Sequence, residues 1–504
     1  MTGTGPGSDR ERRLNVLLIT ADQLRGDFLG FAGHPTVRTP HLDALAAEGV
    51  AFPNAYSPVP VCVPARYAMM TGRSAVSIGV RGNASVPIPP ECVTLPAAFA
   101  RAGYATGAFG KMHFTPWDEP YGFETFTVSE EGRQAGRDGG LGDAYQRYLR
   151  TTGWGGWERA HGIGNNDVRT SSSPLPLEHY HTTWCARETA SWLRRRVTEA
   201  PERPFFAWCS FTKPHSPYDP PEPYDRLYDP RAFPPPIGDA SDLEGLSPAY
   251  QEMRRGRMLD ALGWEQVQRA RAMYAGNVTL IDHAVGGLRH TLQELGVAGR
   301  TVVLFTADHG DLLGDHGLFF KATFFRAAWH VPFVVYAPGR ATGGRRDPRF
   351  LASEDVYPTL LDLALGAGEG DGGAGTDGSA GAAVGRSALA GPGAARDTVF
   401  GSVGPAPRAQ HAARSERWSY VLHARGGYEE LYDLRADPEE RRNLAERAAP
   451  STAGRQLRAG LEAWLAAGGD RGCLDESGHL RSDPGARGWT PEPPPRHGLG
   501  LRPY

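Results

Sequence analysis

The stretch LNVLLIT at residues 14–20 decides the fold, because this largely apolar run leads directly into the polar loop ADQLRGD at 21–27. A continuous apolar run of this length is typical of a strand that is buried on both faces. The segment PHLDALAAEGV then predicts a helix, with Pro40 in its first turn and Gly49 just past its end. The chain therefore opens with a strand, a loop and a helix, as chains with parallel sheets do.

The same order of elements returns further along the chain. PFFAWCSF at 204–211 predicts a strand that leads into the Pro-rich loop 213–224, and a long helical pattern at 265–296 leads to the strand TVVLFTA at 301–307 and the acidic loop ADHGD. Loops that follow parallel strands meet at one edge of the sheet. We therefore expect an α/β fold whose large central sheet is mixed, mostly parallel and flanked by helices.

Composition excludes several classes of protein. The chain has 504 residues, of which 40% are hydrophobic and 22% charged, which is typical of a globular protein. The 54 Lys and Arg against 57 Asp and Glu give a net charge of −3, so no net field attracts nucleic acid or an anionic membrane. No run approaches the roughly 18 apolar residues that a membrane span needs. We expect a soluble protein with neither kind of partner.

Two features predict a cytoplasmic location. Arg12 and Arg13 before the apolar run resemble a signal peptide, but the run ends at residues 22–25 without a small-residue cleavage site, which favours a buried first strand. The five cysteines are odd in number and scattered, which suits a reducing compartment.

The chain divides into two predicted domains. Residues 1–395 form a large α/β domain that includes a Gly-rich loop at 366–384 and a helix at 353–365 with Ser353 as its N-cap. Residues 396–504 form a smaller α+β domain with an antiparallel sheet and a Pro-rich tail from about Asp483. Its expected strands are TVFGSV, RWSYVLH and EELYDL.

The segment PVCVPARYAMMTGR at 60–73 is the sharpest candidate for chemistry. Pro64 suits the first turn of a helix and Gly72 its end, so Cys62 lies at the helix N-terminus and Arg66 follows one turn later. On position alone, a buried cysteine is more often inert packing than a functional group.

The motif C-x-P-x-R at 62–66 resembles the signature of the formylglycine-dependent sulfatases, which belong to the alkaline phosphatase superfamily. Five residues alone could arise by chance, but the resemblance extends from about residue 14 to 465. The family's other blocks follow in order: ITADQLRGD, TPHLDALAAEGVAFPNAYS, GKMHF, KPHSPYDPP, FTADHGDLLGDHGLFFK and ELYDLRADPEERRNL.

This resemblance implies an alkaline-phosphatase-like fold and a nucleophile made from Cys62. A formylglycine-generating enzyme would oxidise the cysteine to an aldehyde, whose hydrate attacks sulfur or phosphorus with one oxygen and keeps the other to release the product anion. Arg66 would stabilise the charged form of that hydrate. The implied reaction is the cleavage of a sulfate monoester to an alcohol and sulfate.

The resemblance also implies one divalent cation, held by Asp22, Gln23, Asp308 and His309. Many sulfatases bind Ca²⁺ with three aspartates and an asparagine. Two carboxylates, an amide and an imidazole depart from that set and resemble the branch of choline sulfatases and phosphonate monoester hydrolases. Imidazole suits Mn²⁺ better than Ca²⁺, so the identity of the metal stays open.

Further residues match the family's positions for binding the transferred anion and protonating the leaving oxygen. They are Lys111, His113, His215 and Lys321, and we expect His215 and Lys321 on the leaving-group side. Asn83 is a further candidate donor to the anion or the nucleophile, although an asparagine beside Gly82 is also typical of a turn.

The same motifs are compatible with other functions. The same residues could cleave phosphonate monoesters or phosphodiesters, since these are also tetrahedral anions, or the chain could be a pseudoenzyme that binds an anion without turnover. The substrate is expected to be a small molecule, with its pocket rim in the insertion 127–180 that contains Trp154 and Trp157. A homo-oligomer is compatible with the sequence.

Overall fold

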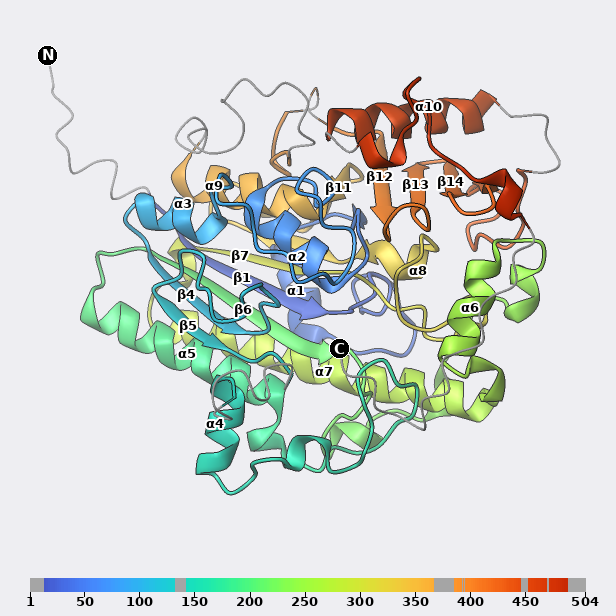
Figure 1. Cartoon of the computed structure of the whole chain (residues 1–504). Coiled ribbons are helices and arrows are strands. Elements are labelled where there is room, and N and C mark those ends of the chain that lie inside the picture. Colours follow the sequence, from blue (N-terminus) through green and yellow to red (C-terminus); the bar gives the residue numbers. More distant parts are fainter. Residues whose placement is uncertain are drawn as a thin grey trace, which may run out of the picture.

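A central eight-stranded sheet organises the protein (Figure 1). The computed structural model describes residues 13–131, 142–366, 385–391, 393, 395–445, 452–468 and 471–487. The strand order is β10-β2-β9-β7-β1-β6-β4-β5. The strands are β1 (Asn15–Asp22), β2 (Val50–Ala51), β4 (Ala105–Gly110), β5 (Thr125–Val128), β6 (Phe205–Pro214), β7 (Thr301–Ala307), β9 (Phe333–Tyr336) and β10 (Arg345–Arg346).

The pairing confirms the expected mixed, mostly parallel sheet. The strand β1 is parallel to both β6 and β7, and β4 is parallel to both β5 and β6. Antiparallel pairs join β9 to β7 and to β2. All eight residues of β1 are buried, as expected for a strand with helices on both sides of the sheet. A second, three-stranded sheet in the order β11-β3-β8 contains β3 (Asn54–Tyr56), β8 (His330–Val331) and β11 (Phe350–Ala352).

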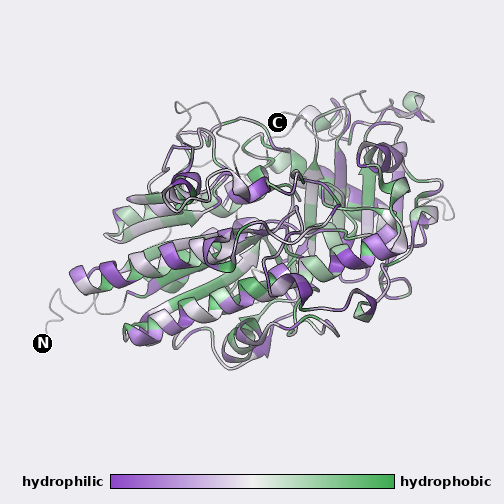
Figure 2. Ribbon diagram, turned by 90° about the horizontal axis from the view of Figure 1, so that it is seen from below, coloured by the Kyte–Doolittle hydropathy of each residue, from purple (hydrophilic) through white to green (hydrophobic). Residues whose placement is uncertain are grey.

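Helices cover both faces of the central sheet (Figure 1). The helices α5 (His181–Glu199) and α7 (Trp264–Glu294) contact β6 from one face, and α1 (Pro40–Glu48) packs against α7. On the other face α2 (Cys62–Thr71) contacts α3 (Leu95–Arg101) and α9 (Val356–Leu365). Figure 2 shows hydrophilic and hydrophobic residues alternating along the long helices, as amphipathic helices on a sheet require.

Local sequence signals place most of these elements correctly. The helix α1 begins at Pro40 and ends before Gly49, and α2 ends before Gly72, whose φ of 64° lies in the left-handed region that glycine tolerates. The predicted Ser353 cap is wrong. Residues Ser353–Asp355 form a 3₁₀ turn before α9, and the Asp355 carboxylate, rather than the Ser353 hydroxyl, accepts a hydrogen bond from the Ala352 amide.

The C-terminal part is a separate antiparallel sheet in the order β12-β13-β14-β15. Its strands are β12 (Thr398–Val403), β13 (Gln410–Ser415), β14 (Trp418–His423) and β15 (Tyr428–Asp433), and α10 (Thr452–Ala467) packs against β13 and β14. The sequence predicted all of these strands except β13. Side chains of this sheet share one hydrophobic cluster with Tyr56, Phe324 and Trp329 of the larger part.

The remaining features of the fold are the domain boundary, the shorter helices and the apolar character of the helices. The domain boundary at 395/396 stays a prediction, and most of the predicted Gly-rich loop and of the Pro-rich tail lies outside the described residues. Three shorter helices are α4 (Ala144–Thr151), α6 (Pro248–Gly256) and α8 (Arg326–Trp329). Among the described residues, no helix combines the length and apolar character needed to cross a bilayer.

Candidate active site

Four buried side chains meet where β1, β7 and α2 converge. Metal-ligating atoms of Asp22, Cys62, Asp308 and His309 all lie within 4.8 Å of one another. The Sγ atom of Cys62 is 3.2 Å from Nε2 of His309 and 3.7 Å from Oδ1 of Asp22. Asp22 ends β1, Asp308 directly follows β7, and Cys62 begins α2. The tertiary structure thus brings the predicted nucleophile together with three of the four predicted metal ligands.

The surroundings of Cys62 favour its ionised form. Burial of the side chain and the Asp22 carboxylate both act to raise the pKa of the thiol. The ammonium groups of Lys321 and Lys111, with His309, act in the opposite direction, and the net shift of the pKa is downward. Position 62 is therefore a place where negative charge is stabilised at a helix N-terminus.

Arg66 faces the carboxylates of the cluster. Its Nε donates to Oδ2 of Asp308 at 3.0 Å, and its Nη1 donates to Oγ of Ser210 at 2.9 Å. Nη2 lies 3.7 Å from Oδ2 of Asp22. Burial acts to lower the pKa of the guanidinium, but the two aspartates outweigh burial and raise it. Arg66 is thus a fixed positive charge that orients Asp308.

Lys111 follows β4 and reaches the cluster from the other side. Its ammonium pairs with Oδ2 of Asp22 and, at 2.9 Å, with Oε2 of Glu131. Burial acts to raise the pKa of Asp22, but Lys111, His215, Arg66 and His309 together hold it well below its usual value. Asp22 is therefore an anion that a nearby cation stabilises.

The donor set fits a divalent cation. Nδ1 of His309 lies 2.9 Å from the carbonyl of Gly310. Because a carbonyl oxygen can only accept a hydrogen bond, Nδ1 carries the proton. Nε2, which lies toward Asp22 and Asp308, is then the atom that can bind a metal. Oδ1 of Asp308 accepts hydrogen bonds from the amides of Gln23 and His309. Two carboxylates and one imidazole nitrogen suit Mn²⁺ or a related ion.

Gln23 also lies at the site, with φ of 68° in the left-handed region. Its Oε1 accepts a hydrogen bond from Lys321 at 2.5 Å, and its Nε2 donates to Asp311 at 2.5 Å. The amide oxygen thus contacts Lys321 here, and ligation of a metal by Gln23 stays a prediction.

His215 and Lys321 form a direct pair. Nζ of Lys321 is 2.6 Å from Nε2 of His215, and Nδ1 of His215 is 2.7 Å from the carbonyl of Ser216. Burial and Lys321 lower the pKa of His215 well below its usual value. The imidazole is therefore neutral, with its proton on Nδ1, and Nε2 accepts from the ammonium.

Comparison with known proteins identifies the family. A family model described as Sulfatase matches residues 14–367, more than half of the chain. The chain belongs to the sulfatase family. This sulfatase is 34% identical to an arylsulfatase of Clostridium perfringens over 374 residues, which cover 69% of this chain and 74% of that protein. It is 31% identical to a choline-sulfatase of Rhizobium meliloti over 439 residues, which cover 86% and 82% of the two chains.

A solved structure agrees with these relatives. The phosphonate monoester hydrolase of Agrobacterium radiobacter matches the sulfatase with a TM-score of 0.76 and 26% identity, over 94% of this chain and 100% of that one. The sulfatase is therefore a hydrolase of the alkaline phosphatase superfamily. The expected resemblance and the expected fold class are confirmed.

Asn83 contacts the helix that begins at Cys62, and His113 lies two residues after Lys111 in the chain. Oδ1 of Asn83 accepts a hydrogen bond at 3.1 Å from the amide of Val63, one residue after Cys62, so Asn83 caps the first turn of α2. His113 has φ of 59°, and its amide donates to Oε1 of Glu130 at 2.8 Å. Their predicted contacts with the substrate stay predictions.

The insertion 127–180 is tied to the loop that carries His215. Nε2 of His161 contacts Oδ2 of Asp219 at 3.0 Å, and the amide of Asn166 donates to Oγ of Ser216 at 2.8 Å. The Trp154 and Trp157 rings pack edge to face at 5.7 Å, with Trp157 exposed. This placement is compatible with the predicted rim of the substrate pocket.

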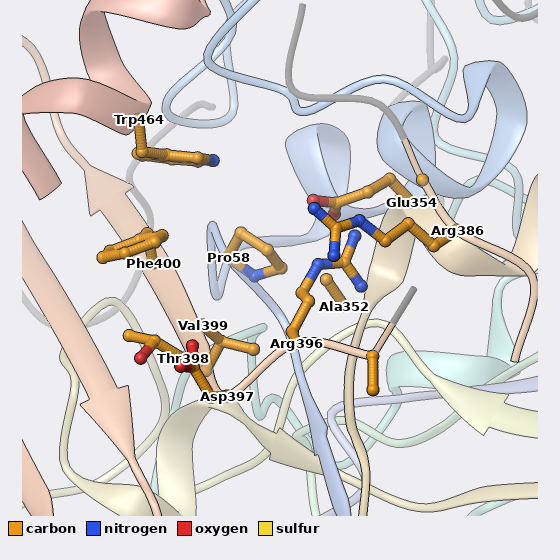
Figure 3. A pocket seen from close by; sticks show the side chains of 12 residues that line it. Pro58, Ala352, Glu354, Arg386, Arg396, Asp397, Thr398, Val399, Phe400 and Trp464 are labelled. Atoms are coloured by element: carbon orange, nitrogen blue, oxygen red, sulfur yellow. The ribbon is translucent and has the colours of Figure 1, made fainter. Parts of the chain in front are cut away.

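A separate cavity of about 680 Å³ lies between the C-terminal sheet and the turn before α9 (Figure 3). The Phe400 and Trp464 rings lie on one side of it, and Arg386 and Arg396 on another. None of its 12 lining residues belongs to the Cys62 cluster. The cavity is therefore a feature of the junction between the two sheets.

Sequence reasoning missed three residues of the site. Ser210 is the next-to-last residue of the predicted strand 204–211, Asp311 lies within the acidic loop ADHGD, and Glu131 follows β5 in the insertion. The acidic loop was a usable signal for Asp311. Only the tertiary structure reveals that Ser210 bonds Arg66 and that Glu131 pairs with Lys111.

Proposed function

We propose that this sulfatase is a metal-dependent hydrolase that cleaves a sulfate monoester to an alcohol and sulfate, with formylglycine at position 62 as the nucleophile. The observation that carries the proposal is the position of Cys62, whose Sγ lies among Asp22, Asp308 and His309. The thiol sulfur of cysteine and the two oxygens of a formylglycine hydrate are bonded to the same atom, Cβ, so the same neighbours would surround them.

Formylglycine and a divalent cation would each supply one kind of chemistry. The hydrated aldehyde provides one hydroxyl for attack and a second that allows the enzyme to release the product anion. A divalent cation, Mn²⁺ or Ca²⁺, held by Asp22, Asp308 and His309 with Gln23 as the predicted fourth ligand, would make the attacking hydroxyl more acidic and polarise the transferred group.

The chain's own residues bind the anion and handle its charge. Lys111 pairs with Asp22 and Lys321 donates to Gln23, and their ammonium groups suit the peripheral oxygens of a tetrahedral anion. Arg66 holds Asp308 in place and counters charge at the nucleophile. Asn83 stabilises the helix turn that presents position 62. His113 lies two residues beyond Lys111, where it would bond the nucleophile.

Proton transfer to the leaving oxygen falls to the pair His215 and Lys321. In this geometry Lys321 carries the transferable proton, because the neutral His215 accepts from it at Nε2. His215 would therefore position the ammonium, while Lys321 donates a proton to the departing oxygen and becomes a neutral amine.

The same site suits a second class of substrate. Phosphonate monoesters and phosphodiesters are tetrahedral anions with similar geometry, and the likeness to the phosphonate monoester hydrolase of Agrobacterium radiobacter supports this alternative. A pseudoenzyme is disfavoured, because the nucleophile position, the arginine, the metal set and both lysines are all present. We further propose a small-molecule substrate, maturation by a formylglycine-generating enzyme and a cytoplasmic location.

Parallel assays test the proposal. The protein is produced together with a formylglycine-generating enzyme, loaded with Mn²⁺ or Ca²⁺, and assayed with an aryl sulfate, an aryl phenylphosphonate and a bis-aryl phosphodiester. We expect turnover of the sulfate ester at the highest kcat/KM. Higher kcat/KM for the phosphorus esters would favour the alternative, and binding of all three without turnover would leave the pseudoenzyme.

A further inference from the structure

Lys111, the lysine that is expected to bind the substrate anion, pairs with the carboxylate of Glu131 as well as with that of Asp22. Oε2 of Glu131 lies 2.9 Å from Nζ of Lys111, and its Oε1 lies 4.0 Å from Nδ1 of His215. The side chain is 7% exposed, and φ of 56° puts this residue in the left-handed region, where tertiary contacts must hold a non-glycine residue. Glu131 therefore contacts Lys111 and lies near His215 in a position that tertiary contacts hold.

The carboxylate changes how much positive charge the pocket offers. The ammonium of Lys111 is shared between Asp22 and Glu131, and Arg66 is shared between Asp308 and Asp22. Lys321 instead faces the amide oxygen of Gln23 and the neutral imidazole of His215. An incoming anion thus meets two cations already countered by carboxylates and a third beside neutral groups.

The candidate substrates share a single negative charge, which a phosphate monoester exceeds. Sulfate monoesters, phosphonate monoesters and phosphodiesters each carry one negative charge, whereas a phosphate monoester gains a second one above a pKa of about 6. The second charge makes no further bond to the nucleophile, but the buried Glu131 carboxylate repels it, and charges interact more strongly in a buried site than in water. The attraction of Lys111 for it is weakened by the same carboxylate.

We propose that Glu131 is a specificity-determining residue, which admits singly charged tetrahedral esters and rejects phosphate monoester dianions. This inference rests on the proposed function and deepens it, because it assigns a charge class to the substrate of that site.

The test compares two phosphorus esters with the same leaving group and different charge, 4-nitrophenyl phosphate and 4-nitrophenyl phenylphosphonate. At pH 8 the ratio of their kcat/KM values should shift toward the phosphate about tenfold in Glu131→Gln, equivalent to about 1.4 kcal/mol. Glu131→Asp, which keeps the charge, should hold the ratio near that of the unmodified enzyme. Glu124→Gln, at an exposed carboxylate that pairs with Arg203, is the matched control.

The charge of the substrate provides a second readout. Below pH 6 the phosphate monoester becomes a monoanion, so the unmodified enzyme should discriminate less against it there, while Glu131→Gln should show little change with pH. An unchanged ratio in Glu131→Gln, or an equal loss of both activities in Glu131→Gln and Glu131→Asp, would overturn the proposal and leave Glu131 as a structural support of Lys111.

Binding separates this inference from the proposed function. In a Cys62→Ala background, which needs no turnover, calorimetry should find that Glu131→Gln tightens phenyl phosphate about tenfold and leaves phenyl sulfate unchanged. That result supports the charge selection even if no ester is hydrolysed. Equal effects on both ligands would refute it even if the enzyme proves to be an active sulfatase.

Discussion

Nζ of Lys321 lies 2.6 Å from Nε2 of His215, although 106 residues separate the two in the chain. The imidazole is fixed by the carbonyl of Ser216 at Nδ1, and burial together with Lys321 keeps its pKa well below the usual value. Nε2 of His215 therefore carries no proton of its own, and the proton shared by the pair belongs to the ammonium. We therefore expect Lys321 to be the proton donor and His215 its positioning partner.

Lys321→Ala should affect poor leaving groups most. An alkoxide needs a proton in order to depart, whereas a nitrophenolate does not, so alkyl sulfate turnover should fall about 100-fold more than nitrophenyl sulfate turnover. The measurement is the slope of log kcat/KM against the pKa of the leaving group. His215→Asn should steepen this slope less than Lys321→Ala does. Arg66→Ala should slow the turnover of both ester classes alike. An unchanged slope in Lys321→Ala would show that Lys321 is not the general acid.

Cys62 should be converted to formylglycine when the modifying enzyme is present. Peptide mass analysis across residues 60–73 measures the conversion, and activity should rise in proportion to it. Cys62→Ser should keep the fold and the metal but lose repeated turnover, since a serine ester has no second hydroxyl to drive its release. Full activity in a protein that carries only the thiol at this position would contradict the mechanism.

Asp308→Asn should lose metal and activity together. The substitution removes one of two buried carboxylates and also the partner of Arg66, so activity should fall by more than the roughly 10- to 100-fold that is typical of changes outside the ligand shell. Metal content is measured by elemental analysis and the fold by circular dichroism. Asp311→Asn, which touches Gln23 and Tyr218, should retain much more metal. Wild-type metal content in Asp308→Asn would refute the assignment.

Chelation should reversibly inactivate the enzyme. Removal of the ion takes away the charge that is expected to make the attacking hydroxyl more acidic, and activity should return on addition of the native metal. Comparison of Mn²⁺ with Ca²⁺ in this reconstitution identifies the ion, and we expect Mn²⁺ to restore more activity because His309 offers nitrogen. Full activity after exhaustive chelation would contradict metal dependence.

Glu354 should make stability fall as pH rises through the neutral range. Burial and Asp355 raise the pKa of its carboxyl, Arg396 lowers it, and the folded value is about 7 against 4.5 in the unfolded chain. Below pH 4.5 both states are protonated and the contribution is complete. Between pH 4.5 and 7 only the unfolded state ionises, so the folded state loses about 3 kcal/mol of its advantage.

Thermal unfolding of the Glu354→Gln variant at pH 5 and pH 8 measures this effect. The wild type should lose stability relative to the variant between the two values, because glutamine does not titrate. Glu416→Gln, at an exposed carboxylate, is the control and should follow the wild type. Parallel pH profiles for wild type and Glu354→Gln would show that the carboxyl titrates at its ordinary pKa.

Particular elements show why some predictions succeeded. The strands β1 and β7 and the helix α2 carry their signals within a few residues, as apolar runs or as Pro64 and Gly72 at the helix ends. The strand β13 was missed because Gln410–Ser415 contains polar side chains that become buried only through partners. His411 bonds Ser402 there, and Arg414 pairs with Glu440.

The sequence by itself determined the order of most elements and the family, and it predicted the nucleophile position, since burial patterns, helix ends and spaced motifs are local properties of the chain. Only the tertiary structure decided which groups share a proton or a charge. Lys321 donates to His215 and Lys111 is shared between Asp22 and Glu131 because parallel strands deliver distant loops to one edge of the sheet. Hydrogen bonds and Coulomb interactions depend on distances of a few ångströms, which sequence spacing does not set.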